Sequence, residues 1–179
     1  IYPHENFFLD KFLMKLFLKK LDYFVVQSSI VEKELLSLIP SAIYTKIFHP
    51  IYNSFGEKID KLEARKKIKI DSKFIILYSG LIRTYKGFDV LIRSVNKLKK
   101  RINSFKVIAI GESYEKKKYY NLIKKEKIDD CFIWENRYVS DLEIKYYFSA
   151  CDVVALPYRS ASQSGIIPIA YHFDKPVVV

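Results

Sequence analysis

The segment 74–95, FIILYSGLIRTYKGFDVLIRSV, constrains the fold of this chain more than any other stretch. Its beginning, Phe74 to Tyr78, is a short continuous apolar run that ends at Gly80, which is typical of a strand buried on both faces of a parallel sheet. From Phe88 onward, apolar residues recur at spacings of three and four with basic residues outside that stripe, which predicts an amphipathic helix. The segment therefore predicts a strand, a loop and a helix in succession.

The loop between this strand and this helix carries Gly80, Arg83, Lys86 and Gly87. The glycines let the backbone approach a ligand closely, and the two cations lie beside a helix N-terminus, whose free N–H groups and partial positive charge attract anions. The pattern favours a phosphate site. An ordinary turn with solvated basic residues remains the alternative.

The alternation of strands and helices continues to the end of the chain. Helix starts are indicated by Asp60 with Glu63 three residues later, and by Ser140. Alternation of this kind predicts βαβ units and a doubly wound, Rossmann-like parallel sheet, whose ligands bind beyond the carboxyl ends of the strands. The predicted strands are 74–78, 105–110, 131–134, 152–156 and 177–179, the predicted helices 61–68, 88–98, 114–127 and 141–149, and the strand-end loops 80–86, 111–113, 136–139 and 157–165.

The N-terminal third has a different character. Residues 7–21, FFLDKFLMKLFLKKL, are densely apolar and cationic. They are readable as a basic amphipathic helix on a membrane surface, or as a helix packed on a sheet with its lysines (Lys11, Lys15, Lys19 and Lys20) outside. We favour packing, because apolar residues cover more than one narrow face. Strands are predicted at 23–26 and 43–48 around a helix at 30–38, and the polar connection at 53–59 predicts a domain junction, with domains 1–50 and 51–179.

Charge and cysteine content narrow the function classes. The chain has a net charge of +11 and a pI near 9.4, which invites a nucleic-acid-binding hypothesis. The lysines fall mostly on the outer faces of predicted helices, and no binding face with interleaved aromatics is evident, so a solvated surface is favoured and nucleic acid is not an expected partner. Cys131 and Cys151 lie in apolar runs without a CxxC pair, which predicts buried free thiols and a reducing compartment.

No run of 18 uncharged apolar residues occurs, and the N-terminus has no signal-peptide pattern, so neither a membrane span nor export is expected. The chain begins with Ile1 and ends on a strand at 177–179. We therefore expect it to be a fragment cut at both ends.

The sequence resembles a known family in the same loops. The motifs are GLIRTYKGFDVLI, VIAIGES, SDLEIKYYFSACDVVALPYRS and SGIIPIAYHFDKPVVV, preceded by VVQSS, KIFHPIYNSFG and EARKKIKI. In this order and at these spacings they are similar to the C-terminal half of glycosyltransferase family 4, the retaining nucleotide-sugar enzymes with the two-domain GT-B fold. The resemblance implies that residues 1–50 end an acceptor domain and that 51–179 form most of a donor domain.

The resemblance also implies roles for individual residues. Arg83 and Lys86 match the basic pair that holds the donor diphosphate, although the family commonly has its arginine directly after the glycine, where this chain has Leu81. The remaining implied donor contacts are Gly80 and Gly111, which let the backbone approach the donor, Glu112 beside the second glycine, and Tyr138 and Val139 in the loop along the nucleotide base.

The final loop departs from the family. Two glutamates that usually meet the donor sugar and the ribose correspond here to Ala161 and Ile169. In their place the loop offers short polar side chains and a glycine before a helix, a suitable cradle for anions and hydroxyls. The resemblance implies altered sugar contacts, and a noncatalytic relative is the alternative. The residues of this cradle are Ser160, Ser162, Gln163, Ser164 and Gly165.

The expected activity is transfer of a hexose from a UDP- or GDP-sugar to a glycan or lipid-linked acceptor in bacterial cell-envelope polysaccharide synthesis. The implied location is the cytoplasm, with peripheral contact at the inner face of the membrane. No metal or cofactor is expected, since the sequence has no Asp-x-Asp cluster and the family generally works without one. His4 resembles an acceptor-side residue and is a catalytic candidate, with capping or packing as the alternative. His49 and His172 are assigned to structure, and a hydrolase built on a histidine dyad is poorly supported.

Overall fold

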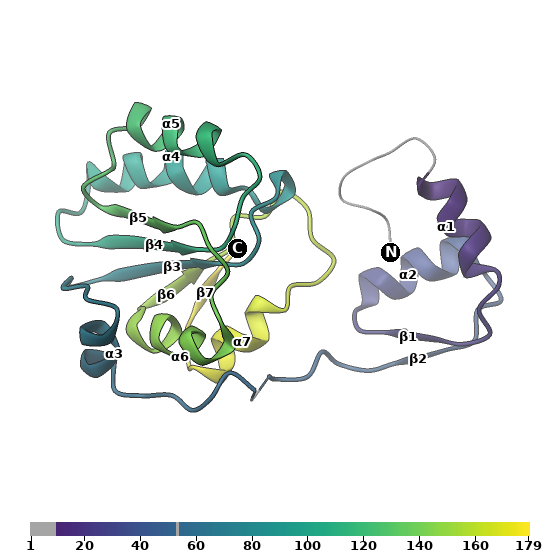
Figure 1. The fold of residues 1–179 in the computed structure, drawn as a ribbon. Coiled ribbons are helices and arrows are strands. Elements are labelled where there is room, and N and C mark those ends of the chain that lie inside the picture. Colours follow the sequence, from purple (N-terminus) through teal and green to yellow (C-terminus); the bar gives the residue numbers. More distant parts are fainter. Residues whose placement is uncertain (1–9, 53) are drawn as a thin grey trace. The chain divides into compact units, whose positions relative to one another are not determined.

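The computed structural model describes residues 10–52 and 54–179 (Figure 1). The chain divides into two compact units, and each is described by itself. The smaller contains the described part of Ile1–Pro50 together with Ser160–Gly165, and the larger contains Ile51–Arg159 and Ile166–Val179. The sequence assigns the loop 160–165 to the second domain, whereas the structure groups it with the smaller unit.

The larger unit is built on a five-stranded parallel sheet with strand order β5-β4-β3-β6-β7. Its helices cover both faces: α4 and α5 lie on one face, and α3, α6 and α7 on the other (Figure 1). The strands are β3 (Ile75–Ser79), β4 (Lys106–Ile110), β5 (Phe132–Glu135), β6 (Val153–Ala155) and β7 (Val177–Val178). The helices are α3 (Lys61–Lys67), α4 (Phe88–Lys99), α5 (Lys116–Lys125), α6 (Asp141–Ala150) and α7 (Ile166–His172).

The apolar run at 74–78 forms strand β3, whose side chains enter the cores on both faces of the sheet. Ile76 and Tyr78 pack in the core beneath α4 and α5, whereas Ile75 and Leu77 pack in the core beneath α6 and α7. Successive side chains point to opposite faces of a strand, and both faces are covered here, so residues 75–78 are large and mainly apolar at every position. The two cores are therefore separated by the sheet itself.

The order of the strands places a switch point between β3 and β6. From β3 the chain proceeds outward through β4 to β5, then crosses to the other side of β3 to form β6 and β7. The predicted doubly wound parallel sheet is confirmed. Open sheets of this kind bind ligands beyond the carboxyl ends of the strands at such a reversal, which directs attention to the loops that follow β3 and β6.

Helix starts and cysteines follow the sequence expectations. The Asp60 carboxylate accepts hydrogen bonds from the backbone N–H groups of Leu62 and Glu63 and caps α3. A capping box joins Ser140 and Glu143 at the start of α6. Cys131 and Cys151 are buried free thiols. These local features depend on short-range hydrogen bonding or on burial within a strand-like run, which sequence patterns report directly.

The smaller unit contains α1 (Asp10–Leu18), β1 (Phe24–Val26), α2 (Ser29–Leu38) and β2 (Tyr44–Lys46), and β1 pairs in parallel with β2. The expectation that the helix at 7–21 packs its apolar residues on a sheet is wrong for the described residues. The large apolar side chains of α1 are exposed, among them Phe12, Leu13, Leu16 and Phe17.

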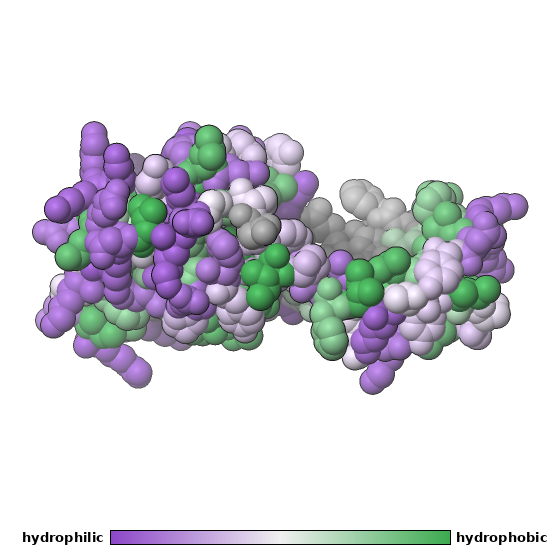
Figure 2. Space-filling view, turned by 90° about the horizontal axis from the view of Figure 1, so that it is seen from below, coloured by the Kyte–Doolittle hydropathy of each residue, from purple (hydrophilic) through white to green (hydrophobic). Residues whose placement is uncertain are grey.

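Hydrophobic residues are spread over the surface of the smaller unit, at the right of Figure 2. In the same view the larger unit is mostly hydrophilic. Within residues 10–52 and 54–179, the helices are too short or too polar to cross a membrane.

Candidate functional site

A cavity of about 350 Å³ lies at the carboxyl ends of the strands in the larger unit. It brings together five of the residues that the sequence analysis assigned to donor binding: Gly80, Gly111, Glu112, Tyr138 and Val139. The other lining residues are Ser79, Leu81, Ile110, Arg137 and Ile144. Residues from the ends of three neighbouring strands and from α6 therefore enclose one space.

The two glycines of the cavity have backbone conformations that other residues rarely adopt. Gly80 has φ 111° and Gly111 has φ 135°. Backbone hydrogen bonds link the strand ends around them: the N–H of Gly80 donates to the carbonyl of Ile110 at 3.0 Å, and that of Gly111 donates to Glu135 at 3.2 Å. The Trp134 indole N–H donates to the Gly111 carbonyl at 3.0 Å. The ends of β3, β4 and β5 are thus hydrogen-bonded to one another at the cavity.

The two predicted cations stand in the loop after β3. Lys86 ends the 3₁₀ turn η1 (Thr84–Lys86). A Cβ placed on Gly80 would lie 3.3 Å from the Lys86 Nζ, so the ammonium approaches the backbone glycine of the cavity. Arg83 precedes η1, with its guanidinium 5.0 Å from the centre of the Tyr114 ring. Both cations belong to the larger unit, although neither is among the cavity-lining residues.

The environment of Lys86 is electrostatically unusual. Burial of its ammonium, with a further contribution from the Arg83 guanidinium, lowers the pKa of Lys86 below its ordinary value. Burial and a like charge both oppose the charged form, and an anion bound nearby would offset both.

The sequence analysis missed the network that holds the loop after β5. Arg137 donates from Nη2 to Glu143 at 2.8 Å and from Nε to Glu135 at 3.0 Å. The Tyr147 hydroxyl donates to Glu135 at 2.7 Å. These bonds connect the end of β5 to α6 across the cavity loop. The capping box at Ser140 gave a signal for Glu143, but the pairing with Arg137 six residues earlier has no sequence signature.

Tyr138 and Val139, the two residues predicted to lie along the nucleotide base, have different environments in this loop. Val139 is buried, whereas the Tyr138 ring is 70% exposed at the cavity. A buried aliphatic side chain anchors the loop, and an exposed aromatic ring beside it offers a stacking surface.

The remaining candidates are not brought to this cavity. Ser160, Gln163, Ser164 and Gly165 belong to the smaller unit together with Ala161, and their role stays a prediction. Ile169 is buried in the core beneath α7. His4 lies outside the described residues. The imidazoles of His49 and His172 lie within hydrogen-bonding distance of the carbonyls of Pro50 and Gly56. Among the described residues, no group of three or more His, Cys, Asp or Glu could hold a metal ion.

Solved structures show the same fold at low sequence identity. Sucrose-phosphate synthase from Thermosynechococcus elongatus superposes with a TM-score of 0.78 at 17% identity over 93% of this chain and 42% of that chain. HepE from Anabaena, solved in complex with UDP-glucose, gives 0.78 at 14% identity over 94% and 48%. A glycosyltransferase from Rickettsia africae gives 0.70 at 18% identity over 99% and 48%. This chain thus spans less than half of each of these proteins.

These matches confirm the predicted GT-B type of fold. A search of the curated proteins finds no match. A family model does match: the one described as "Glycosyl transferases group 1" covers residues 60–179, which include every strand of the larger sheet. The resemblance found in the sequence motifs is thereby confirmed. The chain belongs to the glycosyl transferases group 1 family.

Proposed function

We propose that this chain carries the donor-binding part of a retaining glycosyltransferase, which transfers a hexose from a nucleotide diphosphate sugar to a glycan or lipid-linked acceptor. The observation that carries the proposal is the half-buried Lys86 ammonium beside Gly80, at the end of β3 and next to the cavity. HepE, a structural neighbour, was solved in complex with UDP-glucose, which supports a nucleotide-sugar donor here.

In the proposed reaction, this part of the protein stabilises the negative charge that develops on the leaving group. Departure of the nucleoside diphosphate builds negative charge on the leaving phosphate, and preorganised cations in a partly dry site stabilise that charge. Lys86 and Arg83 supply the cations, with Arg83 offering a forked donor for phosphate oxygens. Gly80 and Gly111 leave room for the donor next to the backbone, and the exposed ring of Tyr138 offers a stacking surface for the nucleotide base. This division of roles requires no metal ion.

The proposal is tested by calorimetric binding of UDP, GDP and their hexose conjugates to the full-length protein. Lys86→Ala and Arg83→Ala are each expected to weaken binding about tenfold or more, because charge-assisted hydrogen bonds to phosphate contribute about 1.5 to 3 kcal/mol. Lys97→Ala, which removes an exposed lysine of α4, is the matched control and should leave binding unchanged. A folded protein that binds none of these nucleotides would contradict the proposal.

A noncatalytic sugar-nucleotide-binding relative is the second candidate, and a specific observation favours it. The two family carboxylates are replaced by Ala161, which is exposed, and Ile169, which is buried. This candidate predicts donor binding without turnover. Release of UDP or GDP from the bound sugar conjugate, in the presence of a membrane and glycan extract, separates the two: sustained release supports the enzyme.

A role at the inner face of a bacterial membrane, in cell-envelope polysaccharide synthesis, extends the proposal. Helix α1 exposes Phe12 and Phe17 beside the cations Lys15 and Lys19, a combination suited to an anionic lipid surface. The full-length protein is expected to sediment with vesicles containing phosphatidylglycerol and to lose this association in the Phe12→Ser, Phe17→Ser double variant. Equal sedimentation of both proteins would contradict the membrane role.

A further inference from the structure

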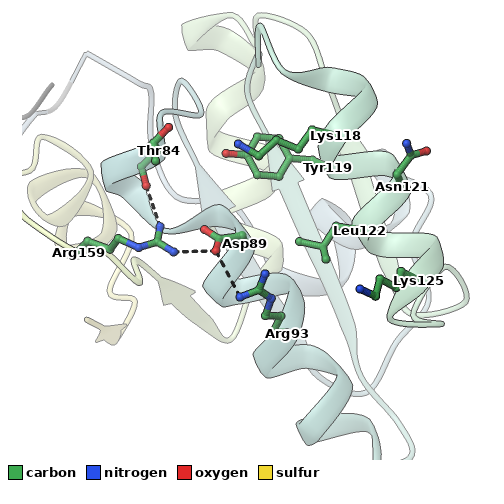
Figure 3. A pocket seen from close by; sticks show the side chains of 9 residues that line it. All are labelled: Thr84, Asp89, Arg93, Lys118, Tyr119, Asn121, Leu122, Lys125 and Arg159. Carbon is green, nitrogen blue, oxygen red and sulfur yellow. Dashed lines mark hydrogen bonds and ion pairs between the residues drawn. The ribbon is translucent and has the colours of Figure 1, made fainter.

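Arg159 connects the loop after β6 to the loop after β3. It follows β6 and precedes Ser160–Gly165. Its backbone N–H donates to the Tyr85 carbonyl at 2.8 Å, and its guanidinium Nη1 donates to the Thr84 carbonyl at 2.8 Å. Its Nη2 donates to the Asp89 carboxylate at 2.7 Å, at the start of α4 (Figure 3). One residue thereby holds two of the three residues of η1 and the helix that follows.

Other contacts of the loop after β6 hold the same turn. A Cβ placed on Gly87 would lie 1.8 Å from the Pro157 carbonyl oxygen, so the backbones of the two loops are in direct contact. The Lys86 ammonium lies 5.9 Å from the centre of the Tyr158 ring. Residues 157–159 thus form one wall against which η1 and the Lys86 side chain rest.

The Asp89 carboxylate holds the guanidinium in place. It is shared between Arg159, at 2.7 Å, and Arg93, at 3.9 Å. The hydrogen bond from Arg159 is the main reason that the pKa of Asp89 lies below its ordinary value. The side chain of Asp89 is 19% exposed and that of Arg159 is 44% exposed, so the pair is only partly screened by solvent.

We propose that Arg159, held by Asp89, is a positioning residue for donor binding: it fixes the turn Thr84–Lys86 so that the Lys86 ammonium meets the donor diphosphate. The inference rests on the proposed function, because it assigns Lys86 the diphosphate. It adds a residue to which the sequence analysis gave no role and which lies outside the lining of the donor cavity. Arg159 acts through the turn and makes no contact with the ligand.

A direct contact between Arg159 and the ligand is the competing explanation. The two explanations predict opposite changes in nucleotide affinity for a second substitution, Asp89→Asn. Asp89→Asn removes a negative charge from the neighbourhood of the phosphates. If Arg159 attracted the phosphates itself, loss of its carboxylate partner would free the guanidinium and strengthen binding. If Arg159 acts by holding the turn, the same substitution loosens the guanidinium and weakens binding.

The test is calorimetric titration of the full-length protein with whichever of UDP and GDP it binds. Arg159→Gln and Asp89→Asn are each expected to weaken binding about fivefold to tenfold, the loss of one or two hydrogen bonds to a charged group. Arg159→Lys retains the charge but cannot contact both Thr84 and Asp89, so it should weaken binding as well. Arg93→Gln is the matched control, since Arg93 shares Asp89 but has no bond to the turn, and should change binding less than twofold.

A double-mutant cycle with Lys86→Ala supplies the decisive readout. In the Lys86→Ala background, Arg159→Gln should have little further effect, because the group that the turn positions is gone. Additive effects, unchanged binding in Arg159→Gln, or tighter binding in Asp89→Asn would overturn the inference while Lys86→Ala still supports the proposed function. Failure of the unsubstituted protein to bind either nucleotide would overturn both. Thermal unfolding of each variant verifies that it is folded. If Arg159→Gln does not fold, Arg159→Lys takes its place in the double-mutant cycle.

Discussion

A Cβ placed on Gly111 would lie 2.2 Å from the carbonyl oxygen of Gly80. The two glycines end neighbouring strands, so the loops after β3 and β4 are in backbone contact where the cavity begins. A side chain at Gly111 would push the two loops apart, whereas a side chain at Gly80 would meet the Lys86 ammonium and the Ile166 side chain. This contact explains why two glycines 31 residues apart in the sequence both face the cavity.

Gly111→Ala is expected to lower the free energy of unfolding by about 2 to 4 kcal/mol and to abolish nucleotide binding. The alanine would combine an unfavourable φ of 135° with a clash against backbone, which cannot rotate away as a side chain can. Urea unfolding followed by circular dichroism measures the first effect and calorimetry the second.

Gly56→Ala provides the control for this substitution. Its φ is also positive, at 81°, but the nearest atom to an added Cβ is the flexible Lys145 Cδ at 3.3 Å. The cost should be about 1 kcal/mol, from the backbone alone. Equal losses in the two variants would show that the contact with Gly80 is not the cause.

Tyr78→Phe is expected to raise the free energy of unfolding by about 1 kcal/mol. The Tyr78 hydroxyl is buried and has no hydrogen-bond partner in the part of the chain that the structure describes. Burial of a hydroxyl removes its hydrogen bonds to water, and without a protein partner no new hydrogen bond offsets that cost. Its removal therefore stabilises the folded state. Tyr147→Phe is the matched control: that hydroxyl donates to Glu135 at 2.7 Å, and its loss should destabilise. The prediction fails if Tyr78→Phe destabilises as much as Tyr147→Phe.

Glu143 is expected to make the stability of the larger unit sensitive to acid. Hydrogen bonds from Arg137, and secondarily from the Ser140 backbone, lower the pKa of Glu143 from 4.5 to about 2. A carboxylate with a lowered pKa in the folded state stabilises the fold fully above pH 4.5, and this contribution is lost as the pH falls from 4.5 toward 2.

The Glu143→Gln variant tests this dependence. It should be less stable than the unsubstituted protein at pH 6, and the difference should shrink through pH 4 and 3 and vanish near pH 2. Urea unfolding at these pH values gives the difference directly. A gap between the two proteins that stays constant with pH would show that the Glu143 charge has no role.

Asp152→Ala is expected to lower the free energy of unfolding by about 2 to 4 kcal/mol. The Asp152 carboxylate accepts hydrogen bonds from Arg65 at 2.8 Å and from the Ile75 backbone N–H at 2.7 Å, and it also pairs with Lys61. It therefore ties α3 to the first strand of the sheet, and its removal leaves the largely buried Arg65 guanidinium without its counter-charge.

Asp130→Ala offers a comparison within the same chain. Its carboxylate pairs with Lys99 at 2.5 Å, but the Asp130 side chain is 64% exposed. Exposed pairs contribute about 0 to 1 kcal/mol, so this variant should unfold almost as the unsubstituted protein does. Similar losses for Asp130→Ala and Asp152→Ala would refute the dependence on burial.

Features that depend on neighbouring residues were predictable from the sequence. The caps at Asp60 and Ser140, the buried strand before Gly80 and the stripe of α4 are each contained within a short window. Glycine at the strand ends pointed to the cavity in the same way. The doubly wound parallel sheet followed because alternating strands and helices of this length leave few arrangements, whereas the strand order came from the structure.

Features that depend on contacts between distant residues were not predictable. The Arg159–Asp89 bond joins residues 70 positions apart, and nothing in either local pattern indicates the other. Exposure of Phe12 and Phe17 on α1 was missed for a related reason: periodicity shows that a face is apolar but not what covers it.

The chain contains a single tryptophan, Trp134, and its position has a practical consequence. The indole is packed in the core beneath α4 and α5, and its N–H bonds to the Gly111 carbonyl at the cavity. Intrinsic fluorescence excited selectively at tryptophan therefore reports on the larger unit alone, and on the backbone that borders the cavity. The smaller unit contains no tryptophan, so unfolding of the larger unit can be followed by this emission without any label.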